Sequence, residues 1–436
     1  MNSGQQLWAR AVKSIPGGNG LLSKRPDRYA PDIWPVYFSK AEGVEIWDLD
    51  GKKYIDMAQM GLGTVILGYN NNEVNKSVEQ AISSSINATL NVPEEVYLAE
   101  MLLELNPFAG GVKFARTGGE AMAIAARIAR AYTGKDKIAF SGYHGWCDWY
   151  LAANLTGENN LSEHLLPGLS PKGVPAGLAN TALPFRYNDI EALESLMSEH
   201  NDVGVIAIEG ARYDFPTPEF LDGIQQIARR HHIIVIVDEI TSGWRMTDGG
   251  IYKINGFEPD IVVYGKAMGN GFAISAVVGR HEVMDSAQET FISSTFWTER
   301  VGFAAALKTI EVLVREKVWE HLIAMGTKIG DGWESLARKH GINLHVTDFK
   351  PLITMKLEYA ELNSAIETLF TQEMLKRGYL AAPSIYVCYA HDDAVIDEYL
   401  NVVDEVFAIL AKAIDNNTVE DSLETRVKDQ GFKRLN

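Results

Sequence analysis

Four apolar runs in the middle of the chain constrain its fold more than any other feature. They occupy residues 203–209 (VGVIAIE), 233–239 (IIVIVDE), 260–264 (DIVVY) and 273–278 (AISAVV). Apolar residues recur with helical spacing between the first two runs, at 220–231, and before them, at 189–198. Apolar strands that alternate with helices are typical of a parallel sheet covered on both faces. The sequence therefore predicts an α/β fold.

The regions on either side extend this pattern. Upstream, the sequence predicts a hairpin at 43–54 around Asp50-Gly51, a strand at 112–117, a helix at 120–132 and a strand at 137–140. A long helix is expected at 300–318. Beyond about residue 325 the pattern changes to alternation at 343–357 and helices at 362–377 and 393–413. This change predicts a smaller C-terminal α/β domain.

Composition excludes several classes of function. The 40 basic and 57 acidic residues give a net charge of −17, which argues against a nucleic-acid-binding surface. A hydrophobic content of 46% argues against disorder. Two cysteines cannot form a disulfide framework, and the sequence shows neither a signal peptide nor a membrane-length apolar run. We expect a cytoplasmic protein that contacts neither nucleic acid nor membrane.

Four features near predicted strand ends carry the chemistry. Asp238 ends the most apolar run, where an open parallel sheet faces its ligand crevice. Lys266 follows the next run between glycines, and a lysine desolvated in a crevice becomes a nucleophile for carbonyls. Thr117-Gly118-Gly119 precedes a helix whose first amides can bind a phosphate, and Tyr143 can stack on a flat ring.

Each feature taken alone also has a purely structural interpretation. Asp238 could cap a helix or form a salt bridge, and Lys266 could be a surface lysine in a flexible loop. The glycine pair could be a plain turn, and Tyr143 could belong to the core. Together, however, they supply what pyridoxal phosphate requires: a Schiff-base lysine, an aspartate for the pyridinium nitrogen, amides for the phosphate and an aromatic cover for the ring.

Five motifs, in order along the chain, resemble the class III, fold type I aminotransferases that use pyridoxal phosphate. Within that class they are most similar to the glutamate-1-semialdehyde 2,1-aminomutase branch. The motifs are SIPGGNG, GVEIWDLDGKKYIDM, ARTGGEAMAIAARIARAYTGKDKIAFSGYHGW, VDEITSGWRM and YGKAMGNGFAISAVVGR. The resemblance covers most of the chain. It implies a large domain at 61–324 with a mostly parallel sheet, a small domain at 325–436, and an N-terminal arm and hairpin at 1–60 that pack with the small domain.

The resemblance also implies roles for individual residues. Lys266 is the Schiff-base lysine and proton carrier, and Asp238 meets the pyridinium nitrogen. Ile240 lies beneath the ring, Tyr143 stacks on it, and Glu209 lies near its 3′-oxygen.

Further positions are assigned to the phosphate. Gly118 and Gly119 bind it through backbone amides, with help from Thr117. Thr295 resembles the threonine that reaches the phosphate of the neighbouring subunit, although it could also be a plain strand-end threonine. This last role implies a homodimer with shared active sites.

The sequence departs from the family around the substrate. Phe296–Arg300 (FWTER) replaces the family's Ser/Gly-Gly-Asn-Pro, and Lys24 stands near the place of an arginine that holds a substrate carboxylate in the aminomutases. The run 383–391 (PSIYVCYAH) is shorter and lacks the family's glutamate. Aromatic residues suggest a flat-walled pocket suited to sugars: Trp146, Trp149, Tyr150, Phe296 and Trp297. We expect an amino acid donor and a small carbonyl acceptor such as a keto-sugar.

Two alternatives stay open at this point, and two further kinds of site are not supported. An aminomutase of the glutamate-1-semialdehyde type would use the same residues without an external donor. A sensor that binds the cofactor without turnover usually carries a DNA-binding module, and this chain shows none. The pairs His231-His232 and Ser141/His144 lack the partners for a metal site or a serine hydrolase, so no metal is expected.

Overall fold

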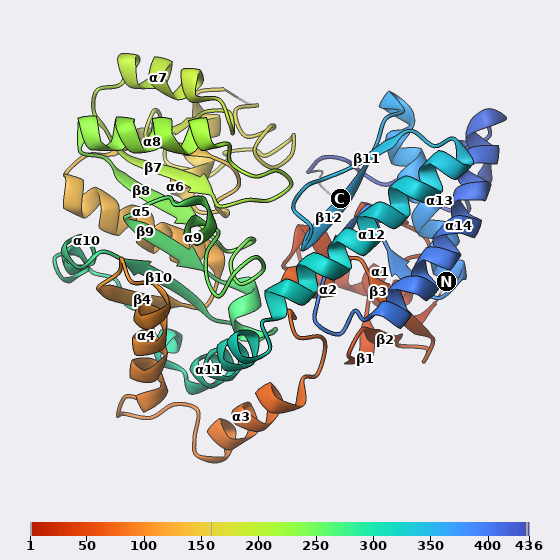
Figure 1. The fold of residues 1–436 in the computed structure, drawn as a ribbon, viewed down its shortest axis with the longest axis horizontal. Coiled ribbons are helices and arrows are strands. Elements are labelled where there is room, and N and C mark those ends of the chain that lie inside the picture. The colour runs from red at the N-terminus through yellow and green to blue at the C-terminus, as the bar shows by residue number, and fades with distance from the viewer. Residues whose placement is uncertain (1, 158, 433–434, 436) are drawn as a thin grey trace. The chain divides into compact units, whose positions relative to one another are not determined.

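The computed structural model describes residues 2–157, 159–432 and 435. Contacts divide the chain into two compact units (Figure 1). The large unit comprises Asn72–Glu320, and the small unit combines the residues up to Asn71 with those from His321 onward. The assignment of 1–60, 61–324 and 325–436 to domains stays a prediction from sequence.

A seven-stranded sheet forms the core of the large unit, in the order β4-β10-β9-β8-β7-β5-β6. Its strands are β4 (Gly111–Ala115), β5 (Lys137–Ser141), β6 (Ala182–Pro184), β7 (Val203–Glu209), β8 (Ile234–Asp238), β9 (Ile261–Tyr264) and β10 (Ser275–Gly279). Every residue of β7, β8 and β9 is buried, because helices cover both faces. The predicted α/β fold with a mostly parallel sheet is confirmed.

The strand β10 runs antiparallel to both neighbours, β9 and β4, whereas the other pairings are parallel. It follows β9 without a crossover helix, and an antiparallel strand needs only such a short connection. The apolar pattern of 273–278 predicted the strand but did not reveal its direction.

Helices of the large unit surround this sheet. Figure 1 shows α7 and α8 packed together on one side of the sheet, with α5 behind it. The helices are α3 (Asn72–Ser83), α4 (Pro93–Leu105), α5 (Gly118–Thr133), α6 (Asp148–Leu151), α7 (Ile190–Glu199), α8 (Pro218–His231), α9 (Tyr252–Asn255), α10 (His281–Asp285) and α11 (Arg300–Arg315). The short 3-10 helix Thr295–Thr298 directly precedes α11 in the chain, and the 3-10 helix Lys266–Gly269 contacts α11 in space.

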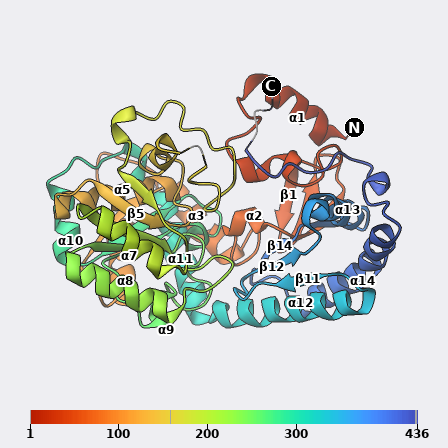
Figure 2. The same cartoon turned by 90° about the horizontal axis from the view of Figure 1, so that it is seen from above.

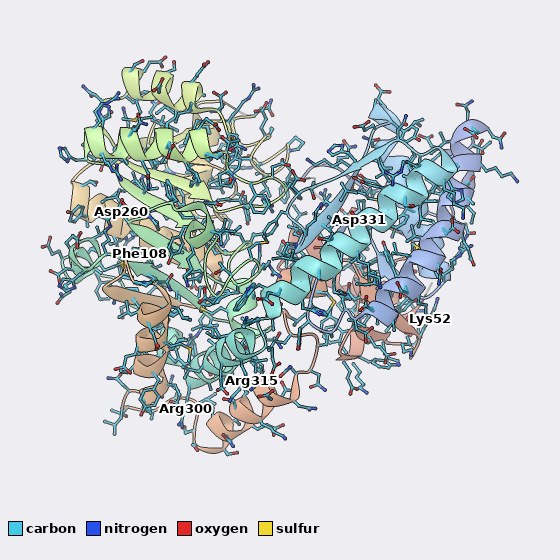
Figure 3. The ribbon with its side chains drawn as sticks, viewed as in Figure 1. Lys52, Phe108, Asp260, Arg300, Arg315 and Asp331 are labelled. Carbon is cyan, nitrogen blue, oxygen red and sulfur yellow. The ribbon has the colours of Figure 1, made fainter. Side chains whose placement is uncertain are left out.

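Two ion pairs fix α11 to its neighbours within the large unit. Arg315 donates to both carboxylate oxygens of Glu73 on α3, at 3.0 and 2.7 Å. Arg300 donates twice to one oxygen of Glu94 on α4, at 2.9 and 2.6 Å. Both arginines extend from α11 in Figure 3. The start of α11 is thereby held where it can support the adjoining loops.

The small unit contains two sheets. The predicted hairpin is present as β2 (Glu45–Asp48) and β3 (Lys53–Met57), and the four-stranded sheet has the order β1-β2-β3-β13. The remaining strands are β1 (Phe38–Glu42), β13 (Tyr379–Ala381), β11 (Leu344–Val346), β12 (Leu352–Leu357) and β14 (Ser384–Tyr386). The strand β13 pairs in parallel with β3, so an N-terminal and a C-terminal segment of the chain belong to one sheet.

Its helices are α1 (Ser3–Ser14), α2 (Met60–Gly63), α13 (Asn363–Lys376), α14 (Asp393–Asp415) and most of α12 (Val318–His340). The helix α12 packs on β11 and β12, where Gly330 faces Val346 and Ile353 (Figure 2). The sequence analysis expected a helix only as far as residue 318 and therefore missed α12. It also missed the three-residue strand β13.

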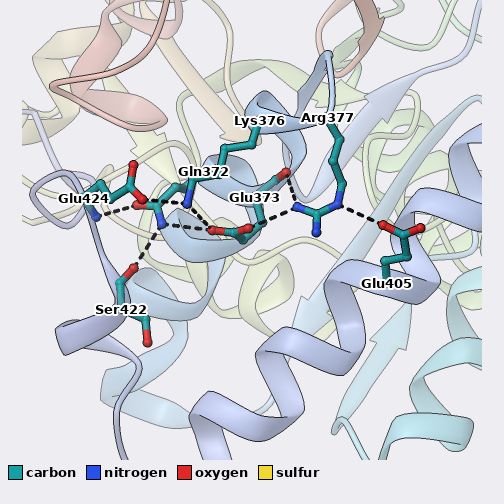
Figure 4. Close-up of polar contacts among 7 residues, drawn as sticks. All are labelled: Gln372, Glu373, Lys376, Arg377, Glu405, Ser422 and Glu424. Carbon is teal, nitrogen blue, oxygen red and sulfur yellow. Dashed lines mark hydrogen bonds and ion pairs between the residues drawn. The ribbon is translucent and has the colours of Figure 1, made fainter.

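Polar side chains fasten the C-terminal segment to α13 (Figure 4). Gln372 donates to the Ser422 carbonyl at 3.0 Å and accepts from the Glu424 amide. Glu373 accepts from Lys376 at 2.7 Å and from Arg377 at 3.1 Å. These contacts give the polar segment after residue 416 a fixed place in the small unit.

Candidate active site

Three neighbouring strands of the large unit bring the predicted catalytic residues together. Glu209 and Asp238 end β7 and β8 and are paired partners in the parallel register. In the next pair, Asp238 lies opposite Val263 of β9, three residues before Lys266. The carboxyl ends of parallel strands meet at one edge of the sheet. Lys266, Asp238 and Glu209 therefore share that edge.

Asp238 is buried and held by two donors. One carboxylate oxygen accepts from the Ile240 amide at 3.0 Å, and the other lies 2.9 Å from His144 Nδ1. His144 is itself buried, and its Nε2 lies 3.1 Å from the Ser141 carbonyl oxygen. These contacts fix the direction of the carboxylate. The contact between His144 and Asp238 was not predicted from the sequence, where His144 was considered only with Ser141 as part of a hydrolase site.

Lys266 begins the 3-10 helix that follows β9 and has a positive φ of 40°. Its Nζ donates to Thr241 Oγ1 at 2.7 Å. Non-glycine residues with positive φ are uncommon and cluster at functional sites. Thr241 was not singled out from sequence, although it lies within the quoted VDEITSGWRM motif.

Glu209 positions Tyr143. Its Oε2 accepts from the Tyr143 amide at 3.1 Å, and a Cβ at Gly142 would lie only 2.5 Å from the same oxygen. The Arg212 guanidinium lies 3.7 Å from Glu209 Oε1 and 5.6 Å from the centre of the Tyr143 ring. Burial raises the pKa of Tyr143 above its usual value. The sequence analysis missed Arg212, which follows the Glu209 strand by only three residues.

The turn at Thr117–Gly119 opens α5 with a capping box. The Glu120 amide donates to Thr117 Oγ1 at 3.5 Å, and the Glu120 carboxylate accepts from the Thr117 amide at 3.0 Å. A Cβ at Gly118 would lie 2.8 Å from Ile240 Cδ1. Ile240 also lies 3.5 Å from where a Cβ at Gly265 would be. The isoleucine thus lies between the turn that opens α5 and the turn that carries Lys266.

Thr295 is exposed at the start of the 3-10 helix Thr295–Thr298. Arg116, the residue before Thr117, donates to the Phe296 carbonyl at 2.8 Å. The neighbours of Thr117 and Thr295 in the sequence, Arg116 and Phe296, are therefore hydrogen-bonded to each other. This link was not predicted from the sequence.

A buried carboxylate supports the loop behind Asp238. Glu239 accepts from Ser242 Oγ and from the Tyr252 amide, and burial raises its pKa to about 7. A Cβ at Gly210 or Gly250 would come within 2.8 Å of the Glu239 carboxylate. These glycines leave the space in which the side chain is enclosed.

Two predictions about the substrate pocket need correction. Trp149 and Tyr150 belong to the core around Phe140, and Tyr150 donates to the Gly142 carbonyl at 3.1 Å, so they do not form a pocket wall. Trp146 and Phe296 are exposed.

Two arginines that lie near the motifs of the site, Arg25 and Arg245, are held inside the protein. Arg25 is buried in an ion pair with Asp27 of the small unit. Arg245 is fully buried, and its Nε donates to the Thr241 carbonyl at 2.8 Å. Arg245 thus braces the loop that follows Asp238.

In the parts of the chain that the structure covers, no group of three or more His, Cys, Asp or Glu side chains is arranged to hold a metal ion. Over the same residues, no helix is long and apolar enough to cross a membrane.

The sequence matches the family description Aminotransferase class-III over residues 28–351. The chain belongs to the class III aminotransferases. It is 32% identical over 421 residues to a 3-aminobutyryl-CoA aminotransferase from Cloacimonas acidaminovorans, covering 94% of this chain and 97% of the relative. It is 31% identical over 435 residues to a glutamate-1-semialdehyde 2,1-aminomutase from Methanothrix thermoacetophila, with the same coverage of each chain.

Solved structures show the same fold. The FumI protein of Sphingopyxis sp. MTA144 superposes with a TM-score of 0.86 at 24% identity, covering 98% of each chain. An omega-transaminase from Sphaerobacter thermophilus gives 0.83 at 24% identity, covering 94% of this chain and 98% of that chain. The predicted family and fold are confirmed, and this class III aminotransferase uses pyridoxal phosphate.

The residues present fit this cofactor. The absence of a side chain at Gly118 keeps the start of α5 open above Ile240, where a Cβ would collide. The first amides of α5 and the helix dipole favour an anion there. The buried carboxylate of Asp238 ends β8, and Lys266 follows the neighbouring strand β9. The ring nitrogen of the cofactor needs such a carboxylate, and its aldehyde needs such a lysine.

Proposed function

We propose that this aminotransferase moves an amino group from an amino acid donor to a small-molecule carbonyl acceptor, with Lys266 as the Schiff-base lysine. The observation that carries the proposal is the convergence of Lys266, Asp238 and Glu209 on three adjacent strand ends. When bound, pyridoxal phosphate supplies an aldehyde and a pyridinium ring that draws electrons from the substrate Cα.

Each residue has a defined task in this proposal. Asp238, held by His144 and the Ile240 amide, keeps a proton on the ring nitrogen. Lys266 Nζ removes a proton from the substrate and returns it, and Thr241 Oγ1 orients the amine. Tyr143 would cover one face of the ring of the bound cofactor, and Ile240 would cover the other.

The remaining tasks concern the edge of the ring and the phosphate. Glu209 fixes Tyr143 through its amide and stands near the ring's 3′-oxygen. Gly118 and Gly119, with Thr117, hold the phosphate of their own subunit. Thr295 reaches the phosphate of a second copy, so we also propose a homodimer with shared active sites and a cytoplasmic location.

The acceptor is proposed by chemical class. The segments 296–300 and 383–391 differ from the family's pattern, and these differences favour a keto-sugar as the acceptor. The corrected positions of Trp149 and Tyr150 leave Trp146, Phe296 and Trp297 as the aromatic residues that could contact it. The name of the Cloacimonas relative adds a second carbonyl to test, a 3-oxoacyl thioester.

The decisive experiment is an absorbance spectrum of the purified protein before and after L-glutamate is added, with 2-oxoglutarate assayed in the same tube. Loss of the band of lysine-bound cofactor together with keto-acid formation supports an external donor. The acceptors are then a keto-sugar and a 3-oxoacyl thioester. Absence of that band in cofactor-saturated protein would overturn the proposal.

A second candidate function is intramolecular amino transfer, favoured by the 31% identity to a glutamate-1-semialdehyde aminomutase. A mutase converts its substrate without an external amino acid donor. Turnover of glutamate 1-semialdehyde in donor-free buffer supports this candidate, and a strict need for a donor excludes it.

The assignment of Lys266 is tested with the variant Lys266→Ala. We expect turnover to stop while some cofactor stays bound through its phosphate and ring contacts. Repeated turnover by this variant would show that another group carries the proton. Lys253→Ala is a suitable control, since Lys253 lies on α9 and pairs with Asp248.

A further inference from the structure

Arg116 connects two segments that the proposed function places at cofactor phosphates. It directly precedes Thr117, the residue that caps α5. Its side chain is 12% exposed, its Nε donates to the Phe296 carbonyl at 2.8 Å, and its Nη2 donates to the Glu299 carbonyl. One half-buried guanidinium thereby joins the turn at Thr117–Gly119 to the 3-10 helix Thr295–Thr298.

The same side chain packs against the start of α11. Its guanidinium carbon lies 4.8 Å from the centre of the Phe303 ring, and Nη2 lies 3.7 Å from a carboxylate oxygen of Glu299. Glu299 in turn caps α11 by accepting from the Val301 amide at 2.7 Å. Phe296, Glu299 and Phe303 therefore all contact the Arg116 guanidinium. These contacts restrict its motion more than that of an exposed arginine side chain.

Hydrogen bonds within the 3-10 helix Thr295–Thr298 fix its backbone conformation. They do not fix its position relative to the turn at Thr117–Gly119. Thr298 Oγ1 donates to the Thr295 carbonyl at 3.1 Å, and the Glu299 amide donates to the Phe296 carbonyl at 3.3 Å. Thr295 and Phe296 are exposed, whereas Trp297 is half-buried and packs against the core of the large unit. Arg116 adds two charge-assisted hydrogen bonds, to the carbonyls of Phe296 and Glu299.

We propose that Arg116 is a positioning residue that holds Thr295–Thr298 in a fixed place relative to the phosphate-binding turn, so that Thr295 is presented to the cofactor phosphate of a second copy. The proposal rests on the proposed function of Thr295 in a shared active site. Arg116 acts through the two carbonyl groups and needs no contact with the cofactor itself.

The first test measures whether the segment depends on Arg116. Arg116→Met keeps an unbranched apolar side chain but removes the guanidinium, and with it both donors and the contact with the Phe303 ring. Arg127→Met is the matched control, because Arg127, on α5, also donates to a backbone carbonyl, that of Phe291 at 3.1 Å, but is exposed. We expect amide exchange over 294–302 in cofactor-free protein to become about tenfold faster in Arg116→Met and to stay unchanged in the control.

The second test uses the two ligands pyridoxal phosphate and phosphate-free pyridoxal. We expect Arg116→Met to raise the Kd of pyridoxal phosphate about tenfold and that of pyridoxal hardly at all, with Arg116→Lys in between because lysine can still donate one bond. A general loss of stability would weaken both ligands equally, so the ratio isolates the phosphate.

Three outcomes would count against these ideas, and they differ. Unchanged exchange in Arg116→Met overturns the link between the two segments. Faster exchange with an unchanged ratio of affinities overturns the presentation of Thr295 to a phosphate. A wild-type protein that binds neither ligand contradicts the proposed function, whereas the exchange result would still decide the role of Arg116 in holding the segment.

Discussion

At the scale of single residues, the site depends on strand register, which the sequence does not contain. Each of Glu209, Asp238 and Lys266 follows an apolar run and was therefore found from sequence. Register then sets Glu209 directly opposite Asp238. His144 was missed because its contact with Asp238 joins residues 94 positions apart, and no local pattern predicts such a pair.

Replacing Asp238 by Asn should slow turnover by at least about 100-fold, because the neutral amide cannot keep a proton on the ring nitrogen. The steady-state rate with saturating cofactor measures this. Asp260→Asn is a matched control, since Asp260 also contacts a backbone amide, that of Val235 at 2.8 Å, but precedes β9 at its other end. A near-normal rate in Asp238→Asn would mean that another group meets the nitrogen.

Glu239 predicts a pH dependence of stability. Burial raises its folded-state pKa from 4.5 to about 7, so the folded protein binds more protons between these values than the unfolded chain. Stability should therefore fall as pH rises from about 4.5 to about 7, by on the order of 3 kcal/mol from this group alone.

The variant Glu239→Gln isolates this contribution, because glutamine stays neutral throughout. The difference in unfolding free energy between wild type and variant should shift with pH over this window in favour of the variant. Denaturant unfolding at pH 5, 6 and 7 measures the difference. A constant difference would show that Glu239 titrates alike in the folded and unfolded protein.

At the scale of elements, the sequence predicted most helices and strands, and its failures have physical causes. The connection from Tyr264 to Ser275 is shorter than the dozen or more residues that a parallel crossover needs, so the antiparallel direction of β10 could have been inferred. The helix α12 contains Gly326, Gly330 and Gly332, which lower its helix propensity. Close packing requires at least the first, where a Cβ would lie 2.1 Å from the Lys350 carbonyl oxygen.

Gly302 provides a test of how closely α11 approaches the site. A Cβ there would lie 2.7 Å from the Ala273 carbonyl oxygen and 3.0 Å from Arg116 Nη1. Gly302→Ala should destabilise the protein by about 1–3 kcal/mol through this collision, more than the gain of up to about 1 kcal/mol in helix propensity.

Denaturant unfolding of the Gly302→Ala variant gives the sign of the change. Gly177→Ala is the control, because a Cβ at Gly177 would meet nothing within 4 Å. A Gly302→Ala variant more stable than wild type would contradict this prediction. It would show that the start of α11 can move away from Ala273 and Arg116 without loss of stability.

At the scale of the whole molecule, every residue proposed to hold the cofactor lies in the large unit, Asn72–Glu320. A ligand stabilises the structure that binds it, by about 2.7 kcal/mol at a concentration 100 times its Kd. Removing pyridoxal phosphate should therefore lower amide protection mainly in the large unit. Exchange measured with and without cofactor tests this, and an equal loss in the small unit would contradict it.

The pairing of β3 with β13 has a consequence for how the chain is made. Ile55 leaves the ribosome early, but its partner Tyr379 is about 320 residues further along, which is on the order of half a minute of synthesis. During that interval the edge of the N-terminal hairpin that will pair with β13 is unpaired. Every strand of the seven-stranded sheet is synthesised before the interval ends. The small unit should therefore be the last part of the chain to fold, and the hairpin edge is where a nascent chain would need protection from aggregation.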